Sequence, residues 1–482
     1  MVGVKNTNTF GNEIARSLPF FLIILFNMVT LGKSVNCILA IPEMLFVIYW
    51  IIRSRLDKAL FYHMVFYMTC ISENNVHHLE LEHFYSYARI KLIGHIGMAD
   101  LILLTILILA ILNSHKKSKE LKLFGKLNKL FLYLFFSAVV IGLIGCLFFD
   151  YQFSEFVNKS IYMLFVVVLM NAILYNDSSY LRKKVCKSAF PLIWSASVAA
   201  IFSYFFLGVS SNYGGVDSLV LTPDVAYFSP ILLFAFFDRN KLWASIGYLC
   251  FLYPALTQSG GKSYLILAVS FAAFLYVLYA RPDTFSKKTV LWLKIIVAVL
   301  IVVSAFVMPS IQLSNYGTVK LQAALSLFGG MDDMNGSPMI RLGTMLNLFD
   351  EGLHNPFFMI FGHGYGGYFT DSLGLLNGID LADAWPEEVL RTGRFTSAHD
   401  TFASVPLFNG FLGLFLVLRM GVKFIKSIPL SVYSFAAVQF LIFTLYFNIQ
   451  LAMIGVFFLY AADIEIVNNN QIRNGKNIIY NQ

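Results

Sequence analysis

Long runs of apolar residues constrain the fold of this chain more than any other feature of its sequence. A helix needs about 20 apolar residues to cross the hydrocarbon core of a bilayer, and runs close to that length recur along the 482 residues. Hydrophobic residues make up 58% of the chain and charged residues only 13%, whereas soluble domains carry about 25% charged residues. The sequence therefore predicts an integral membrane protein.

The apolar runs predict an all-α, polytopic bundle of about 14 transmembrane helices. We expect one bundle and not several soluble domains, although the length alone would allow several. The runs lie near residues 17–31, 36–52, 57–72, 95–113, 129–149, 160–175, 188–208, 225–237, 242–257, 264–280, 291–308, 404–420, 428–446 and 449–463.

The basic residues predict how the bundle is oriented. Lysines and arginines gather in alternate connections, and with both termini in the cytoplasm roughly 26 of the 35 lie inside, as the positive-inside rule requires. The net charge of +8 is then mainly a topology signal. We expect the basic loops to lie beside anionic membrane lipids and not to bind nucleic acid.

The same topology places one large connection on the outer side of the membrane. We therefore divide the chain into a transmembrane bundle at 1–308, the outer loop at 309–403, C-terminal transmembrane helices at 404–463 and a cytoplasmic tail at 464–482. The five cysteines show no paired spacing, so we expect neither a disulfide framework nor a metal site.

Two stretches of the outer loop have the pattern of a helix. Ser337 followed by Pro338 is typical of a helix start, and Gly352 can end that helix. The second stretch is residues 384–391. The first has an apolar stripe that can lie on the bundle or on the membrane surface: Leu342, Met345, Leu346 and Phe349.

The segment GHGYGG at 362–367 resembles a phosphate-binding loop at first sight. Such a loop must join a strand to a helix in a βαβ unit, and neither pattern flanks this segment. Its outer location also separates it from cytoplasmic ATP and NAD. We expect a glycine turn that lets the backbone pass close to a helix or a ligand.

A few basic residues lie on the outer side, and four of them can converge above the bundle. For each one the alternative is a solvated or interfacial charge, and Lys262 can equally be a lysine that snorkels to the interface. Arg341 falls on the first turn of the predicted helix, off its apolar stripe. The four residues are Lys262, Arg341, Arg391 and Arg394.

Two further runs resemble the outer-loop signature of the O-antigen polymerase and O-antigen ligase superfamily: RLGTMLNLFDEGLHNPFFMIFGHGYGGYF at 341–369 and SAHDTFASVPLFNGFLGLF at 397–415. In that pattern an arginine opens a helix, Asn-Pro leads into G-x-G-x-G, and a histidine precedes G-x-x-G. The matching residues are Arg341, Asn355, Pro356, Gly362, Gly364, Gly366, His399, Gly410 and Gly413. The resemblance covers about a third of the chain by motif, and all of it by architecture.

The chain departs from the family pattern at two positions. Asp400 follows His399 where the family usually has asparagine, which can change how the histidine is oriented. In TQSGGKSYL at 257–265, similar to the family's T-x-S-R-G element, the arginine is replaced and Lys262 is the nearest cation. One pyrophosphate contact can therefore move to another residue.

The resemblance implies a GT-C-like glycosyltransferase of the bacterial inner membrane. We expect neither a metal nor another cofactor, because the paired acids of MDDMNG at 331–336 have the spacing of a turn before Ser337. The donor would be a glycan on undecaprenyl pyrophosphate. A base must then take the proton of the acceptor hydroxyl, and cations must stabilise the leaving pyrophosphate. We expect His399 to be the base, Asp400 to orient it or to cap the helix, and Arg341 to hold the pyrophosphate.

A helix N-terminus at His399 would keep its imidazole neutral and able to accept a proton. Other expected substrate contacts lie in the same loop and at the outer mouth of one span. The loop aromatics can stack on sugars, and the loop histidines can touch substrate or simply lie at the surface. The expected pyrophosphate and glycan contacts are Lys262, Arg391, Arg394, His363, Gly364 and Tyr365.

Three functions remain open, and we favour the polymerase. It would move the growing glycan onto a new lipid-linked repeat unit, and the resemblance implies a chain-length regulator protein as a possible partner. The Phe, Tyr, Ile, Asn and Lys content resembles the AT-rich coding typical of sugar-cluster genes. A ligase would instead transfer the glycan to lipid A core. A transporter of lipid-linked oligosaccharides would need ionisable groups within the membrane, of which Glu43 and His63 are the clearest.

Overall fold

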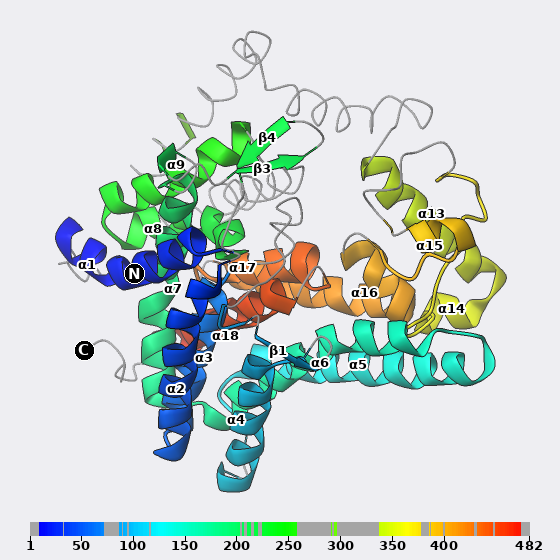
Figure 1. Ribbon diagram of the computed structural model, residues 1–482, viewed down its shortest axis with the longest axis horizontal. Coiled ribbons are helices and arrows are strands. Elements are labelled where there is room, and N and C mark those ends of the chain that lie inside the picture. Colours follow the sequence, from blue (N-terminus) through cyan, green and yellow to red (C-terminus); the bar gives the residue numbers. More distant parts are fainter. Residues whose placement is uncertain are drawn as a thin grey trace.

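The computed structural model is helical in most of the residues that it describes (Figure 1). Seven of these helices are long and apolar enough to cross a membrane. The described residues are 9–31, 33–71, 86–88, 90–93, 96–114, 117–202, 205–206, 210–213, 216–219, 224–257, 291, 294–295, 337–376, 385, 387–398, 401–428, 431–446 and 449–473.

The long apolar helices confirm the prediction of a multi-pass α-helical membrane protein. They are α1 (Phe10–Val29), the continuous η1 (Ser34–Asn36) and α2 (Cys37–Ile52), α5 (Lys122–Phe148), α6 (Phe153–Asn176), α7 (Ser179–Phe202), α16 (Thr401–Ser427) and α18 (Ile449–Arg473). Shorter helices lie between them: α3 (Leu56–Thr69), α4 (Met98–Ser114), η4 (Asp224–Ile231), α8 (Leu232–Asp238), α9 (Lys241–Thr257), α17 (Ser434–Gln439) and η9 (Phe440–Thr444).

Most of the predicted apolar runs therefore coincide with helices. The run at 264–280 lies outside the described residues, as does most of the run at 291–308. The total of about 14 spans stays a prediction. Two short antiparallel hairpins lie between helices, which the sequence did not predict: β1 (Lys91–Ile93) with β2 (Ile96–Gly97), and β3 (Ser210–Tyr213) with β4 (Val216–Leu219).

Helix α18 forms the centre of the bundle, where it contacts α3, α5, α6, α7 and α17. In its most apolar window 83% of the residues are buried, against 28% in each of α1, α2 and α5. The outer helices thus expose large apolar side chains such as Ile52, Phe136 and Leu147. Contiguous apolar surface of this kind is unfavourable in water but suits contact with lipid chains.

Charged residues hold the central helix to its neighbours at one end of the bundle. Asp463 of α18 accepts a hydrogen bond from the backbone nitrogen of Phe124 at 2.9 Å. Tyr460, one turn earlier, donates to Asp177 at 2.7 Å, and Asp177 also pairs with Arg182. These contacts satisfy buried polar groups between helices, so they fix how α5, α6, α7 and α18 are placed along their axes.

The part of the outer loop that the structure describes folds into a helical cap. Figure 1 shows its three helices gathered at one end of α5 and α16, and both α13 and α14 pack on α16. The cap consists of α13 (Ser337–His354), α14 (Pro356–Phe361) and α15 (Glu387–Thr392) with the segments that join them. The predicted helices at 337–352 and 384–391 are thus present with shifted ends.

The sequence predicted that helix α13 can end at Gly352, but the helix continues to His354. A Cβ atom at Gly352 would lie 3.1 Å from the sulfur of Met359, so the glycine leaves room for α14 to pack beside α13. The break comes at Asn355 and Pro356, because proline disfavours helical backbone in the preceding residue. The Asn355 side chain then caps α14 by accepting from the Phe357 nitrogen at 3.1 Å.

The buried face of α13 is partly polar. Its predicted apolar stripe remains partly exposed, with Phe349 44% exposed and touching Phe411 of α16 edge-on. The adjacent face is buried instead, because Asn347 organises the chain that follows the glycine turn. The Asn347 amide donates to Asp371 at 2.8 Å and accepts from the Leu373 nitrogen at 3.0 Å.

The GHGYGG segment inserts between α5 and a break in α16. Gly362, Gly364 and Gly366 all have positive φ angles, which glycine adopts without steric cost. A Cβ atom at Gly364 would lie 2.3 Å from the Gly142 nitrogen of α5, and one at Gly362 would lie 2.5 Å from the Gly410 nitrogen. The prediction of a glycine turn that approaches a helix closely is confirmed.

The break in α16 explains why the segment binds there. Gly410 has φ 70° and ψ 176°, so the turn before it loses its helical hydrogen-bond donors. The His363 nitrogen donates to Leu407 O at 2.7 Å, and the Gly364 nitrogen donates to Phe408 O at 3.2 Å. The glycine segment therefore supplies the donors that the broken helix lacks.

Replacing Gly410 by alanine should destabilise the protein by roughly 2 kcal/mol or more, because the added Cβ is strained at positive φ and overlaps its neighbours. That atom would lie 2.2 Å from the Ile360 carbonyl oxygen. Gly421→Ala in the same helix is the matched control, since its Cβ would meet nothing within 4 Å. Thermal unfolding in detergent measures both, and equal melting temperatures for the two variants would contradict the backbone contact.

Candidate functional site

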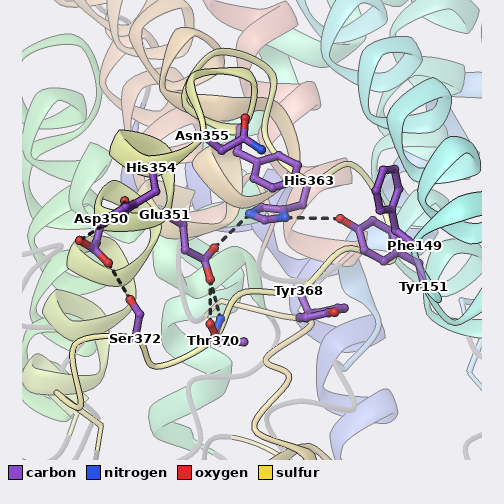
Figure 2. Close-up of a pocket in the computed structure, with 11 residues that line it drawn as sticks. Phe149, Tyr151, Asp350, Glu351, His354, Asn355, His363, Tyr368, Thr370 and Ser372 are labelled. Carbon is purple, nitrogen blue, oxygen red and sulfur yellow. Dashed lines mark hydrogen bonds and ion pairs between the residues drawn. The ribbon is translucent and has the colours of Figure 1, made fainter.

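A cleft of about 540 Å³ opens between the α5–α6 turn and the corner where α13 meets α14 (Figure 2). Its size falls in the range of small-molecule sites, roughly 300–1,000 Å³. Side chains from three separate parts of the chain line it: Phe149, Tyr151, Asp350, Glu351, His354, Asn355, Phe358, His363, Tyr368, Thr370 and Ser372.

A histidine between a carboxylate and a phenol lines the cleft. His363 Nε2 lies 3.1 Å from Glu351 Oε2, and His363 Nδ1 lies 3.4 Å from the Tyr151 hydroxyl. Figure 2 shows the two partners on opposite sides of the imidazole. A carboxylate only accepts hydrogen bonds, so the proton of a neutral ring belongs on Nε2 and the phenol donates to Nδ1.

The local fold fixes each member of this group. The positive φ values of Gly362 and Gly364 turn His363 away from α16 and towards the cleft, where its ring stacks on Phe358 at 4.1 Å between centroids. Glu351 Oε1 accepts from both the nitrogen and the hydroxyl of Thr370, at 2.9 and 3.0 Å. The carboxylate is therefore held in one orientation.

The other oxygen of Glu351 is less well satisfied. Glu351 Oε2 and His363 Nε2 are both buried, yet neither makes an aligned hydrogen bond within the described residues despite their 3.1 Å separation. Buried polar atoms nearly always have such a bond. The two atoms therefore face each other as a buried pair, and neither is accessible from the cleft.

Tyr151 follows the last turn of α5 and faces the histidine from the bundle side. Burial, and then the neighbouring groups Tyr368, Glu351 and Cys146, raise the pKa of its hydroxyl to about 12. At neutral pH the phenol therefore remains a hydrogen-bond donor. Its ring also meets the Tyr368 ring edge-on at 5.6 Å.

One arginine stands beside the cleft. The Arg394 guanidinium lies over the Tyr368 ring at 4.8 Å from the centroid, a cation–π distance. The charged side chains that line the cleft itself are the carboxylates of Asp350 and Glu351. A pyrophosphate group would meet repulsion from them, so the cleft suits a ligand that donates hydrogen bonds.

The predicted site residues are only partly brought together. His363 lines the cleft, Arg394 stacks on a lining residue, and Arg391 is exposed at the end of α15. Arg341 is half-buried near the start of α13, about 15 Å along the helix axis from Glu351 by the rise per residue. Convergence of the four predicted cations stays a prediction, because Lys262 lies outside the described residues.

The two residues expected to perform the chemistry also lie outside the described residues. His399 and Asp400 directly precede Thr401, the first residue of α16. On their other side, the Ser397 carbonyl accepts from the Trp385 indole at 2.9 Å. The residues before the pair are thus bonded to the cap, and those after it belong to a helix of the bundle. The catalytic roles of the pair remain predictions.

Two predicted substrate contacts have structural roles. Tyr365 is fully buried, with its ring packed beside Phe135 and Phe408, so it offers no face on which a sugar can stack. Burial also raises the pKa of its hydroxyl well above the ordinary value. Gly364 contacts the α5 backbone and so serves packing. Trp385, one of the loop aromatics for which sugar stacking was considered, is buried against Phe395.

Sequence reasoning missed Asp350, Glu351 and Tyr151. The two acids were visible next to each other in the predicted helix, four and three residues before His354, and that spacing could have marked them. Tyr151 gave no such signal, because 212 positions separate it from His363. No group of three or more metal-ligand side chains occurs in the described residues.

Comparison with protein-family models, with curated proteins and with solved structures finds no match to this chain. The likeness to O-antigen polymerases and ligases therefore rests on the motif residues themselves.

The raised pKa of Tyr151 predicts a pH-dependent contribution to stability. Above 10.0 an unfolded chain would lose this phenolic proton while the folded chain retains it, so the contribution falls as the pH rises from 10.0 towards about 12. Tyr151→Phe cannot ionise. Thermal unfolding of both proteins across this window should show the wild type losing stability relative to the variant, and a constant difference would contradict the assignment.

Proposed function

We propose that the protein is a membrane glycosyltransferase of the O-antigen polymerase type, which moves a growing glycan from undecaprenyl pyrophosphate onto a new lipid-linked repeat unit. One observation carries the proposal. The two motif runs at 341–369 and 397–415 meet in space, because the backbone at Gly362 lies against the backbone at Gly410. Residues far apart in sequence thus build one cap over the bundle, as a shared site requires.

The chemistry assigns a role to each motif residue. The acceptor hydroxyl gives its proton to His399 while its oxygen attacks the anomeric carbon of the donor glycan. The bond from that carbon to the pyrophosphate oxygen breaks, and the pyrophosphate leaves with the electron pair. Arg341 stabilises the negative charge that develops on it, with Lys262, Arg391 or Arg394 assisting. Asp400 orients the histidine.

The location of the cap supports these roles. The cap lies where α5 and α6 meet, which is the outer side in the topology predicted from the basic loops. A lipid pyrophosphate at the membrane surface would reach cationic groups of the cap there. We accordingly propose an inner-membrane protein with cytoplasmic termini, with a chain-length regulator as a possible partner.

The direct test is transfer in vitro by the purified protein, with an undecaprenyl-pyrophosphate-linked repeat unit as the only substrate. We expect a ladder of glycan lengths on a gel, and loss of the ladder in His399→Ala and Arg341→Ala by at least about 100-fold in rate. Arg419→Ala, an exposed arginine on α16, is the matched control and should retain activity.

The same assay separates polymerase from ligase. Product that forms only after lipid A core is added would identify a ligase and overturn the polymerase assignment. Absence of transfer to either acceptor would overturn the glycosyltransferase proposal itself.

A buried ionisable group favours transport of lipid-linked oligosaccharide as the second candidate. His63 of α3 is fully buried and lies 2.9 Å from the Tyr87 hydroxyl through Nδ1. Within the described residues, His63 Nε2 and Glu43 Oε1 have no hydrogen-bond partner. Intramembrane groups of this kind often relay protons.

Proteoliposomes test the second candidate. A transporter would move the lipid-linked oligosaccharide across the membrane without elongating it, and we expect Glu43→Gln to abolish that movement. Movement that persists unchanged in Glu43→Gln would instead assign the buried group to structure.

A further inference from the structure

Helix α14 carries an apolar face on the outside of the cap. All six of its residues, from Pro356 to Phe361, are apolar, and none of them is buried. Phe357, Ile360 and Phe361 have the spacing of one helix face and are 49%, 44% and 36% exposed. A face of this kind is unfavourable in water. We propose that it is immersed in the acyl chains of the leaflet on the cap side of the membrane, so that α14 and the glycine turn form a re-entrant membrane segment.

The level at which the glycine turn meets α5 carries the argument. No charged residue stands between Lys129 and Asp150, and these 20 residues match the hydrocarbon core of about 30 Å. The turn contacts this stretch at Gly142, six residues or about 9 Å before α5 ends at Phe148. Beyond that contact Leu147 is still an exposed apolar side chain. The turn therefore lies below the end of the apolar span, and α14 leads directly into it.

The backbone of the glycine turn meets the requirement of that depth. Irregular backbone is tolerated within the hydrocarbon core only where protein covers it, and residues 362–367 are all buried. The nitrogens of His363 and Gly364 donate to carbonyls of α16, and the Tyr365 nitrogen donates to Ala138 O of α5 at 3.0 Å. The irregular part of the segment thus faces protein, and the helical part faces outwards.

The start of α14 marks where the segment enters the bilayer. His354 and Asn355 are exposed polar residues directly before it. Pro356 has no N–H group to satisfy, and the Asn355 side chain accepts from the Phe357 nitrogen at 3.1 Å. The six residues of α14 extend about 9 Å. The helix is therefore long enough to run from the headgroup level at Asn355 to the level of the turn.

The neighbours of this face identify lipid as its occupant. The inner side of α14 is covered by the cap, where the Phe358 ring stacks on His363 at 4.1 Å between centroids. The helix also packs on α16 (Figure 1), a membrane span that exposes Leu412 and Phe415. The outer face of α14 therefore continues the lipid-facing surface of the spans that hold it.

The inference goes beyond the proposed function, because it depends on neither His399 nor Arg341 and applies to an enzyme and to a transporter alike. It also gives the cleft a position relative to the membrane. His354 and Asn355 belong to the cleft lining, so the cleft opens at the headgroup level.

The unmodified full chain tests the inference in lipid nanodiscs that contain a phospholipid with a photoreactive diazirine near the end of one acyl chain. After illumination, mass spectrometry of the peptides locates the labelled residues. The control is α15, the other six-residue helix of the cap, on which Glu387 is exposed. We expect residues 356–361 to be labelled within about threefold of the α5 end at 143–148, and at least about tenfold more than α15.

A second phospholipid with the diazirine in its headgroup separates immersion from surface contact. Labelling of α14 by this probe alone, or acyl-chain labelling no higher than that of α15, would overturn the inference. An unlabelled α14 in a chain that runs as a dimer would assign the face to a second copy instead.

A pair of variants provides an independent measurement. Ile360→Asp places a charge on the immersed face and should lower the thermal unfolding temperature in nanodiscs. Leu373→Asp replaces an exposed apolar residue beyond the glycine turn and should leave that temperature unchanged. Equal effects of the two variants would contradict immersion of α14.

Discussion

The backbone contact between the glycine turn and the broken helix determines how the rest of the cap is placed. The N–H groups of His363 and Gly364 bond to the carbonyls that the break at Gly410 leaves without helical donors. In an apolar environment such carbonyls must find a partner within the protein. Gly142 and Gly410 allow the approach because neither has a side chain. The cap is thus joined to the bundle by main-chain bonds that would tolerate few substitutions.

The candidate site follows from this junction. The turn that completes α16 also aims His363 at Glu351, and the α5 helix that receives the turn ends just before Tyr151. The Asp371 carboxylate accepts hydrogen bonds from the Asn347 amide and the Leu376 nitrogen, and these bonds order the chain beyond the turn. Polar contacts therefore fix the position of this segment of the cap, whereas apolar side-chain packing mainly fixes the helices of the bundle.

The sequence predicted the features that depend on local pattern. Apolar runs located the helices, because a span must be continuous in sequence, and the glycine spacing indicated a close backbone approach. The pairing of Tyr151 with His363 could not be predicted, since 212 positions separate them and only the folded chain brings them together. Gly352 and Tyr365 were misassigned because a glycine or an aromatic ring has the same local signal whether it ends a helix, packs a core or meets a ligand.

The hydrogen bonds at the α16 break also limit how the cap can move. Swinging it away from the bundle would leave the Leu407 and Phe408 carbonyls without the donors they have here, at a cost of roughly 1–3 kcal/mol each. Hinged opening at the glycine turn is therefore disfavoured. The cap and the adjoining ends of α5 and α16 form one rigid unit. The cap therefore does not act as a lid that opens and closes at this junction.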